Sequence, residues 1–151
     1  QTLCHGQPEF ATLKPYMPKT LNMRQLGQFM DKTFAGRLDR DKIATIRDTW
    51  KGKLVLKGVA SEYDADLAVD LGLDGIIVSN HGGRQIDVGE SAIHSLQRLA
   101  AKYRPRLTVM MDSGVRSGPD VARAMASGAQ FVFLGRTFMY GVAALGNPGA
   151  D

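Results

Sequence analysis

The sequence predicts an α/β fold with a parallel sheet, and the order of its apolar segments is the main reason. Short apolar runs occupy residues 54–57, 75–79, 107–111 and 131–134, and a segment with helical periodicity follows each of them. Strands that alternate with helices in this way form βα units, whose strands lie parallel in one sheet. The runs are apolar throughout instead of alternating, which is typical of strands covered on both faces.

Helix start and stop signals define the segments between the strands. Ser61 is the predicted N-cap of the first helix, and Gly72 and Gly128 follow the last periodic residues of their helices. A proline lies at the start of the third helix. These signals place helices at residues 61–71, 91–103 and 119–127 and from residue 137 onward.

Residues 1–52 precede these units, and residues 53–151 contain them. Three prolines and the lack of periodicity predict irregular structure for residues 1–20. Apolar residues at helical spacing predict helices at 21–34 and 39–50. The first of these helices carries methionine and phenylalanine side chains on one face. That face either packs within the protein or contacts a membrane or another subunit.

The composition excludes several classes of protein. With 151 residues, of which 44% are apolar and 23% charged, the chain has the length and apolar content of one soluble globular domain. The net charge of +4 comes from scattered basic residues without interleaved aromatic residues, so we expect an anionic small ligand and no nucleic acid. A single cysteine, Cys4, excludes an internal disulfide framework, and no residues have metal-ligand spacing. No apolar stretch is long enough to span a bilayer.

Polar or glycine-rich turns follow the four predicted strands. These turns begin at Lys57, Ser79, Asp112 and Gly135. Ligands of parallel α/β proteins bind at the carboxyl ends of the strands, where such turns meet. We therefore expect the four turns to contribute to one site.

The turn after the second strand carries an imidazole, two glycines and a guanidinium in the segment Ser79-Asn80-His81-Gly82-Gly83-Arg84-Gln85. Because histidine titrates near neutral pH, His81 is a candidate general base. Arg84 presents a rigid donor fork that suits a carboxylate. The alternative is an ordinary strand-end turn in which His81 is only hydrogen-bonded.

The turns after the third and fourth strands combine glycines with arginines. Gly114 and Gly135 expose backbone N–H groups, and Arg116 and Arg136 add charge-assisted donors beside predicted helix N-termini. This combination predicts an anion site of the kind that binds phosphate. The alternative for each arginine is a surface salt bridge.

Two further charged residues follow strands. Lys57 would stabilise negative charge on a bound ring or oxyanion, or would be a solvated charge at the sheet edge. Asp112 would accept hydrogen bonds from ligand hydroxyls, or would cap the following turn. His5 and His94 are expected to be surface or packing residues.

Four motifs in this order resemble the FMN-dependent α-hydroxy acid oxidase and dehydrogenase family, which includes lactate dehydrogenase, glycolate oxidase and mandelate dehydrogenase of the flavin type. They are Leu56-Lys57-Gly58-Val59, Ser79-Asn80-His81-Gly82-Gly83-Arg84-Gln85, Asp112-Ser113-Gly114-Val115-Arg116-Ser117-Gly118 and Phe133-Leu134-Gly135-Arg136. The resemblance implies a (β/α)8 TIM barrel that carries FMN. This chain would supply about four of its βα units, matching strands five to eight, so that residues 53–151 form the C-terminal half of the barrel.

The resemblance also implies a role for each site residue. His81 would be the active-site base at the substrate α-carbon, and Arg84 would bind the substrate carboxylate. Lys57 would lie near the flavin N1–C2 carbonyl and favour the reduced, anionic ring. The implied cofactor-binding residues are Lys57, Ser79, Asp112, Ser113, Gly114, Arg116, Gly135 and Arg136, with Ser79 at the ring, Asp112 at the ribityl chain and the last two glycine–arginine pairs at the phosphate.

The implied function is FMN-dependent oxidation of a small L-2-hydroxy acid, of the lactate, glycolate or mandelate class, to the 2-oxo acid. Electron transfer as hydride and electron transfer through a carbanion are both open. The alternatives are another FMN- or phosphate-binding barrel enzyme and a non-catalytic half-barrel fragment. The expected partners are the hydroxy acid, the N-terminal half of the same enzyme, further copies in a homo-oligomer and a peripheral membrane contact. We expect no metal ion, and a location in the bacterial cytoplasm or at the membrane periphery.

Overall fold

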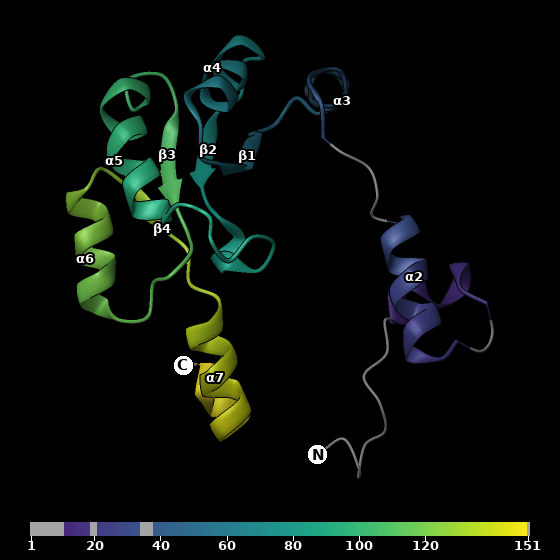
Figure 1. Ribbon diagram of the computed structural model, residues 1–151. Helices are drawn as coiled ribbons and strands as arrows, with labels where there is room; N and C mark the ends of the chain where they lie inside the picture. Colours follow the sequence, from purple (N-terminus) through teal and green to yellow (C-terminus); the bar gives the residue numbers. More distant parts are fainter. Residues whose placement is uncertain (1–10, 19–20, 34–37, 151) are drawn as a thin grey trace. The chain divides into compact units, whose positions relative to one another are not determined.

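The computed structural model describes residues 11–18, 21–33 and 38–150 (Figure 1). The chain divides into two compact units, Gln1–Leu38 (unit 1) and Asp39–Asp151 (unit 2). Cys4 and His5 lie outside the described residues. The expected start of the half-barrel at residue 53 is a separate prediction, and this division does not test it.

Unit 1 contains the 3-10 helix η1 (Ala11–Tyr16) and the α-helix α2 (Met23–Thr33). The prediction of irregular structure is therefore wrong for residues 11–16, and residues 1–10 lie outside the described part. Pro15 fits η1 because its fixed φ is close to that of a 3-10 helix, and the Met17 N–H closes the last turn on the Lys14 carbonyl at 3.2 Å. The predicted helix at 21–34 is confirmed from Met23 to Thr33, whereas residues 21 and 22 precede the helix and residue 34 lies outside the described part.

Unit 2 alternates strands with helices, so the prediction of an α/β fold with four parallel strands is confirmed. The sheet order is β1-β2-β3-β4, and every neighbouring pair is parallel. In Figure 1 the arrows of β2 and β3 point toward the end of the sheet where α7 begins, and β1 is parallel to them. The elements are α3 (Arg40–Thr49), β1 (Val55–Val59), α4 (Glu62–Asp70), β2 (Gly75–Val78), η2 (His81–Gly83), α5 (Ala92–Tyr103), β3 (Thr108–Met111), α6 (Gly118–Ala126), β4 (Phe131–Val132), α7 (Arg136–Leu145) and η3 (Asn147–Ala150).

The predicted caps define the ends of these helices. Ser61 accepts a hydrogen bond from the Asp64 N–H at 3.2 Å and so begins α4. Gly72 follows α4 with φ +66°, a left-handed conformation that glycine adopts without steric cost. Its N–H donates to the Val69 carbonyl at 3.0 Å, and the next N–H reaches back to Ala68 at 2.9 Å, which is a Schellman motif. Gly128 ends α6 in the same way.

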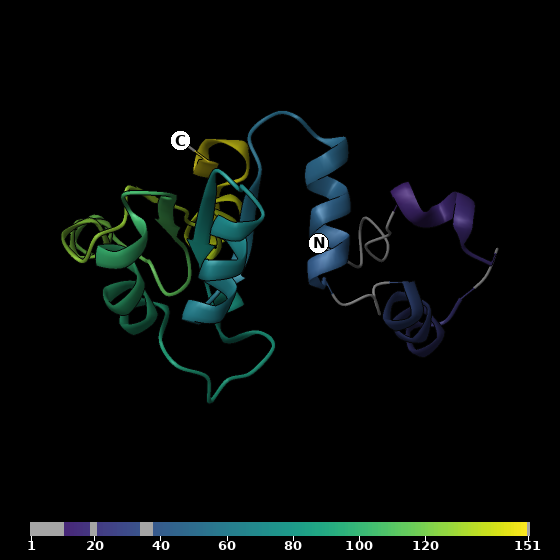
Figure 2. The ribbon, with the colours of Figure 1, turned by 90° about the horizontal axis from the view of Figure 1, so that it is seen from above.

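The core of unit 2 lies between the sheet and helices α4, α5 and α6, which are arranged around one side of the strands in Figure 2. Ile76, Val78 and Val109 of the strands and Leu96 and Leu99 of α5 are fully buried in this core. Burial of each such side chain stabilises the fold by about 1.5–3 kcal/mol.

The opposite face of the sheet carries a row of register partners, Lys57, Ile77, Met110 and Phe131. Ile77 and Met110 are half-buried, whereas Lys57 and Phe131 are exposed. The expectation of a sheet covered on both faces is therefore correct for the helical face and wrong for this one, as far as the described residues show. The strands therefore carry apolar side chains on this second face as well, although the described residues do not bury it.

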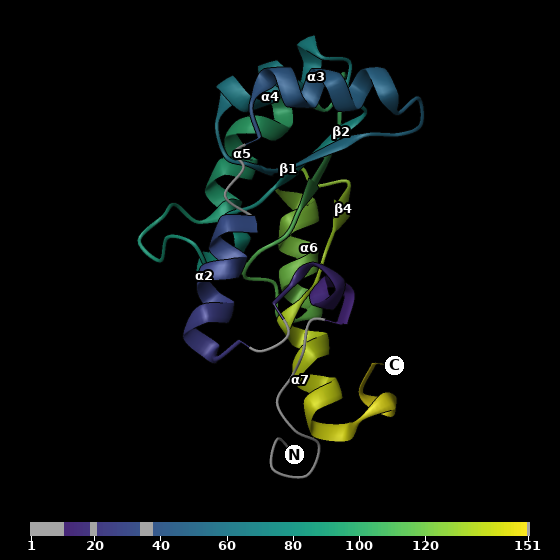
Figure 3. The same ribbon diagram turned by 90° about the vertical axis from the view of Figure 1, so that its right-hand side faces the viewer.

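Helix α3 lies at the end of the sheet opposite α7 (Figure 3). Arg47 of α3 contacts the Asp74 carboxylate at 3.3 Å, and the same carboxylate accepts hydrogen bonds from Lys53 Nζ at 2.7 Å and the Leu54 N–H at 2.9 Å. These bonds hold α3 and the start of β1 to the turn before β2. The carboxyl ends of the strands remain open for a site.

All four strands differ from their predicted bounds, β2 and β3 by one residue and β1 and β4 by up to two. β1 extends to Val59 because Gly58, at φ +91°, forms a bulge at which the register with β2 shifts, so Lys57 lies within the strand and not at its end. β4 ends at Val132, two residues early, because its partner β3 ends at Met111, the residue paired with Val132.

Candidate active site

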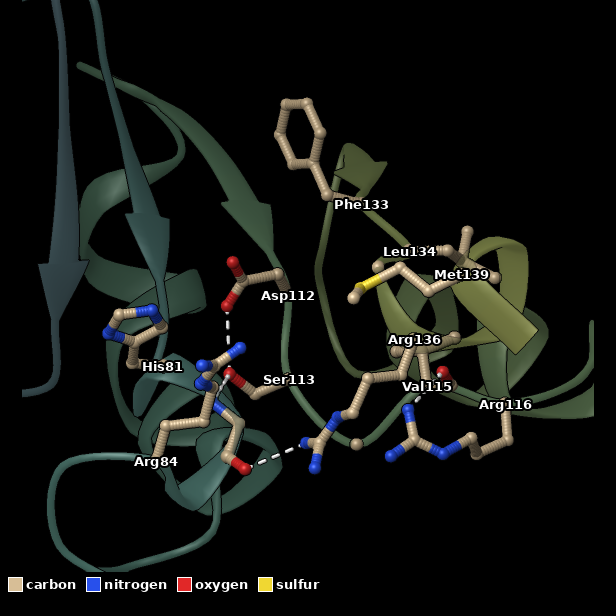
Figure 4. Close-up of a pocket in the computed structure, with 13 residues that line it drawn as sticks. His81, Arg84, Asp112, Ser113, Val115, Arg116, Phe133, Leu134, Arg136 and Met139 are labelled. Atoms are coloured by element: carbon tan, nitrogen blue, oxygen red, sulfur yellow. Dashed lines mark hydrogen bonds between the residues drawn. The ribbon is translucent and has the colours of Figure 1, made fainter. Parts of the chain in front are cut away.

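The carboxyl ends of β2, β3 and β4 and the turns after them surround a pocket of about 200 Å³ (Figure 4). Pockets that enclose a drug-sized ligand usually measure about 300–1,000 Å³, so this pocket can hold only part of such a ligand. The lining residues are His81, Gly82, Arg84, Asp112, Ser113, Gly114, Val115, Arg116, Phe133, Leu134, Gly135, Arg136 and Met139.

The turn after β2 has an unusual backbone. His81, Gly82 and Gly83 have φ values of +57°, +68° and +72°, so three successive residues are left-handed. This conformation costs about 1–2 kcal/mol for a residue with a Cβ, and here that residue is His81. The His81 N–H donates to Ser79 Oγ at 3.0 Å, which helps to hold the strained residue in place. The imidazole is exposed at the pocket.

Lys57 in β1 and the residues that directly follow β2 and β3, Ser79 and Asp112, meet beside this turn. Lys57 Nζ lies 3.0 Å from Asp112 Oδ2 and 3.2 Å from Ser79 Oγ. Lys57 is therefore an ion-pair partner at the site and not a freely solvated charge. The Asp112 carboxylate accepts from the side chains of Lys57 and Ser113, and none of the described hydrogen bonds joins it to a backbone N–H of the following turn.

Burial and hydrogen bonding act in opposite directions on Asp112. Burial raises the pKa of its carboxyl group, but hydrogen bonds from Ser79, Lys57 and Ser113 and the charge of Lys57 outweigh burial and lower the pKa below its ordinary value. The carboxylate is therefore ionised at neutral pH. An ionised Asp112 can accept hydrogen bonds and keeps Lys57 paired.

Ser113 connects the turns after β2 and β3. Its Oγ donates to Asp112 Oδ1 at 2.8 Å, accepts the Gly82 N–H at 2.9 Å and lies 3.4 Å from Ser79 Oγ. Ser113 itself is left-handed at φ +80°, and Gly114 follows at φ +77°. The turn after β3 thus positions the backbone of the turn that carries His81.

Two arginines lie on the other side of the pocket in Figure 4. Arg136 begins α7, and its Nη2 donates to the Gly82 carbonyl at 2.7 Å. Arg116 donates to the neighbouring Val115 carbonyl at 3.4 Å and is otherwise exposed. No side-chain hydrogen bond from the described residues caps α7, whose N-cap residue is Gly135. Two cations and a helix N-terminus therefore face the same space.

The structure brings the predicted site residues together. Eight of the ten line the pocket, and the remaining two, Lys57 and Ser79, join it through the hydrogen bonds to Asp112 and Ser113. His94, which was expected to be an ordinary residue, is exposed on α5. The catalytic and binding roles of the site residues stay predictions at this point.

Sequence reasoning missed the apolar wall of the pocket and the part played by Gly82. Phe133, Leu134 and Met139 form that wall. The sequence predicts that Gly82 allows a sharp turn and the close approach of a ligand, but not that its N–H and its carbonyl are both bound by residues from other turns. A Cβ at Gly82 would lie 2.5 Å from Arg136 Nη2. The two adjacent glycines were the available signal for such a close approach.

The described residues contain no cluster of three or more histidine, cysteine, aspartate or glutamate side chains that would suit a metal ion. None of the helices in this part of the chain is long and apolar enough to cross a membrane.

Comparison with known proteins decides the family. The model of the FMN-dependent dehydrogenase family matches residues 3–151. The chain belongs to this family. Membership confirms the resemblance that the four motifs carry, and it identifies FMN as the cofactor on which the family depends.

Curated relatives agree with the assignment to this family. An L-lactate dehydrogenase of Caulobacter sp. (strain K31) is 43% identical over 147 residues, which are 97% of this chain and 39% of the relative. An L-lactate dehydrogenase of Bartonella quintana (strain Toulouse) is 41% identical over 95% of this chain and 38% of its own length. The chain thus spans about two fifths of the length of the relatives it matches.

Solved structures confirm the fold. A monotopic membrane protein, (S)-mandelate dehydrogenase, matches 99% of this chain and 39% of its own chain, with a TM-score of 0.84 and 37% identity. Mandelate oxidase with benzoyl-formic acid matches 76% of this chain and 34% of its own, with a TM-score of 0.73 and 39% identity. The four βα units therefore correspond to part of the TIM barrel of these enzymes.

Proposed function

We propose that this chain contributes to the FMN-dependent oxidation of a small L-2-hydroxy acid to the 2-oxo acid. The observation that carries the proposal is the arrangement of charges around the pocket. A histidine and an arginine lie on one side, where they suit a hydroxy acid, and two arginines with a helix N-terminus lie on the other, where they suit a phosphate. The names of the relatives, which include lactate and mandelate enzymes, support the substrate class.

The phosphate end fits FMN on the geometry of this chain. A Cβ built at Gly114 or at Gly135 would meet no atom within 4 Å, so both backbones border open space. Arg116 and Arg136 add charge-assisted donors at that space, and the α7 N-terminus adds positive potential. We propose that these groups hold the phosphate, that Asp112 accepts from the ribityl hydroxyls, and that Ser79 and Lys57 contact the ring.

The substrate end rests on His81 and Arg84. Arg84 would bind the substrate carboxylate with two parallel donors and so orient the hydroxyl-bearing carbon toward His81. Oxidation to the 2-oxo acid removes two electrons and two protons from the substrate. FMN would accept the two electrons and one of the protons when it is bound, and a ring nitrogen of His81 takes the other proton.

Lys57 would stabilise negative charge that develops near the ring. Its ammonium group is held by Asp112 and Ser79, so little reorganisation is needed when that charge appears. The pairing with Asp112 also offsets the charge of Lys57 before the reaction.

We propose that the rest of the site comes from polypeptide outside these 151 residues. The small pocket, the uncovered row from Lys57 to Phe131 and the relatives' greater length support this. The complement would be the part of the relatives that this chain does not match, expected from the resemblance to be the N-terminal half. Assembly as a homo-oligomer stays a prediction.

Flavin spectroscopy tests the main proposal. We expect the protein assembled with its complement to bind FMN and to lose the flavin absorbance on anaerobic addition of L-lactate, glycolate or L-mandelate. A protein that binds FMN but is reduced by none of the three would contradict the hydroxy acid assignment and favour another FMN barrel enzyme. Failure to bind FMN at all would favour the non-catalytic fragment.

The two pocket arginines provide a separate prediction about the phosphate. Arg116→Gln and Arg136→Gln should each weaken FMN binding by about tenfold or more, because each removes a charge-assisted hydrogen bond. Riboflavin, which lacks the phosphate, should bind all variants equally in a fluorescence titration. Arg104→Gln, at the exposed end of α5, is the matched control. Equal losses for FMN and riboflavin would contradict the phosphate assignment.

We also propose that unit 1 contacts a membrane surface. The monotopic membrane protein matches nearly the whole chain, whereas mandelate oxidase matches about the share of the chain that lies in unit 2. α2 carries Leu26, Phe29 and Met30 at helical spacing, with exposed basic residues at Arg24 and Lys32. An apolar stripe beside basic side chains is the pattern of an interfacial helix on anionic lipid.

Vesicle sedimentation tests this contact. The protein should sediment with phosphatidylglycerol-containing vesicles, and the double variant Phe29→Ser/Met30→Ser should reduce the bound fraction by about tenfold. Tyr63→Ser, which removes an exposed aromatic side chain from α4 in unit 2, should sediment like the parent. Unchanged sedimentation of the double variant would exclude α2 as the contact.

A further inference from the structure

The segment after β2 leaves the sheet at Asn80 and returns to α5 at Ser91, and its middle is exposed. Residues 84–91 are all exposed, so burial of side chains does not fix this stretch. Yet the segment begins with the strained left-handed residues His81, Gly82 and Gly83. Strained backbone persists only where surrounding contacts determine it. Those contacts therefore identify what positions His81 and Arg84.

The Asn80 side chain joins the two ends of this segment. Its Oδ1 accepts the Gly82 N–H at 3.0 Å, and its Nδ2 donates to the Glu90 carbonyl oxygen at 3.1 Å. The amide thus bonds to the strained turn with one end and to the returning chain with the other. Only a side chain with a donor and an acceptor on the same planar group makes both bonds.

Glu90 fixes the returning chain to α5. Both carboxylate oxygens accept hydrogen bonds from Arg98, one of them at 2.7 Å, and Ser95 Oγ donates at 2.9 Å. Ser95 is 1% exposed, so the carboxylate is attached to the buried side of the helix. Arg98 also donates to the Ala60 carbonyl, at 3.4 Å, which links α5 to the turn after β1.

The charge state of Glu90 keeps these bonds in place at ordinary pH. Hydrogen bonding from Arg98, and then from Ser95, lowers the pKa of Glu90 to about 2. Because the pKa of the folded state lies below the ordinary value of 4.5, the carboxylate is ionised at neutral and weakly acidic pH. The ion pair with Arg98 is lost only as the pH falls toward 2.

We propose that Asn80 and the Glu90–Arg98 ion pair form a clasp that positions His81 and Arg84 for the reaction. Asn80 and Glu90 are positioning residues, since neither lines the pocket between His81 and the arginines. The clasp holds the base of the segment at both ends while its exposed middle remains free to meet a substrate. This inference rests on the proposed function for its effect on catalysis, but the clasp itself is a property of the chain.

Amide hydrogen exchange on the full chain tests the clasp without any reaction. Glu90→Gln removes the ion pair, and Asn80→Asp removes the Nδ2 donor while it keeps the acceptor for Gly82. Both variants should raise the exchange rates of the amides of residues 81–84 by about threefold to tenfold, because the turn opens more often. Exchange in β2 and β3 should not change.

Glu62→Gln is the matched control. Glu62 pairs with Lys102 of α5 at 2.6 Å, so this variant also breaks an ion pair to the same helix, but it does not touch the segment. Its exchange rates at residues 81–84 should equal those of the parent. Parent-like exchange in Glu90→Gln, or an equal rise in Glu62→Gln, would contradict the clasp.

Flavin reduction then tests the positioning role. With FMN bound at unchanged affinity, Glu90→Gln and Asn80→Asp should lower kcat and raise KM for the hydroxy acid, because His81 and Arg84 move together. Faster exchange with parent-like kcat and KM would overturn the positioning role. If the parent itself is not reduced, the proposed function fails, and the exchange data alone decide whether the clasp exists.

Discussion

His81→Asn should leave FMN bound and slow its reduction by a 2-hydroxy acid about a hundredfold or more, because the variant has no group that can take the proton. Asparagine is the appropriate replacement since it tolerates the left-handed conformation at φ +57° better than other residues with a Cβ. Stopped-flow absorbance of the flavin at saturating substrate measures the effect on the reductive step directly.

His94→Asn is the control for this prediction. His94 is the other histidine in the described part of the chain, and it is exposed on α5. The control should be reduced at the parent's rate. A His81→Asn protein that binds FMN and keeps a rate within about threefold of the parent would remove His81 from the role of base.

Arg84→Lys should lower kcat/KM for the hydroxy acid about tenfold to a hundredfold, because an ammonium group keeps the charge but cannot donate two parallel hydrogen bonds to a carboxylate. The loss should lie mainly in KM if the carboxylate is bound equally in the ground state and the transition state. Steady-state kinetics with two substrates of different side chain, such as lactate and mandelate, should give the same relative loss.

Arg104→Lys makes the same exchange at the exposed C-cap of α5, away from the pocket, and should behave like the parent. FMN affinity should stay constant in both variants, since Arg84 lies at the substrate end. If Arg84→Lys had normal KM and kcat, the carboxylate would be bound elsewhere. If it lost FMN instead, the division of the pocket into substrate and phosphate ends would be wrong.

Local signals were enough to predict the alternation of strands and helices in unit 2. Ser61, Gly72 and Gly128 act at the expected helix ends because caps and Schellman motifs depend on a few neighbouring residues. The same holds for the position of the site, since parallel strands place their following turns at one end of the sheet. These features can be predicted from the sequence because each depends on residues within a short stretch of chain.

Features that depend on contacts between distant segments could not be predicted from the sequence. Gly58 gave the same signal for a turn as for the bulge that it forms, and only pairing with β2 distinguishes the two. Arg136 bonds to Gly82, 54 residues away, and Ser113 bonds to the same residue from the turn after β3. The expectation that both faces of the sheet are covered was wrong for one face for a similar reason. Apolar strands predict that a face is buried, but they do not indicate which segment of polypeptide buries it.

The left-handed turn at residues 81–83 has a consequence for the order in which the protein assembles. Its N–H and carbonyl partners come from the end of β2, from the turn after β3 and from the start of α7. Ser113 and Arg136 reach Gly82 only after the strands have paired, so in a partly folded chain only the local bonds to Ser79 and Asn80 offset the backbone strain. We therefore expect the turn to form late in folding and to open before the sheet under mild denaturation, so that the proposed activity is lost before the sheet unfolds.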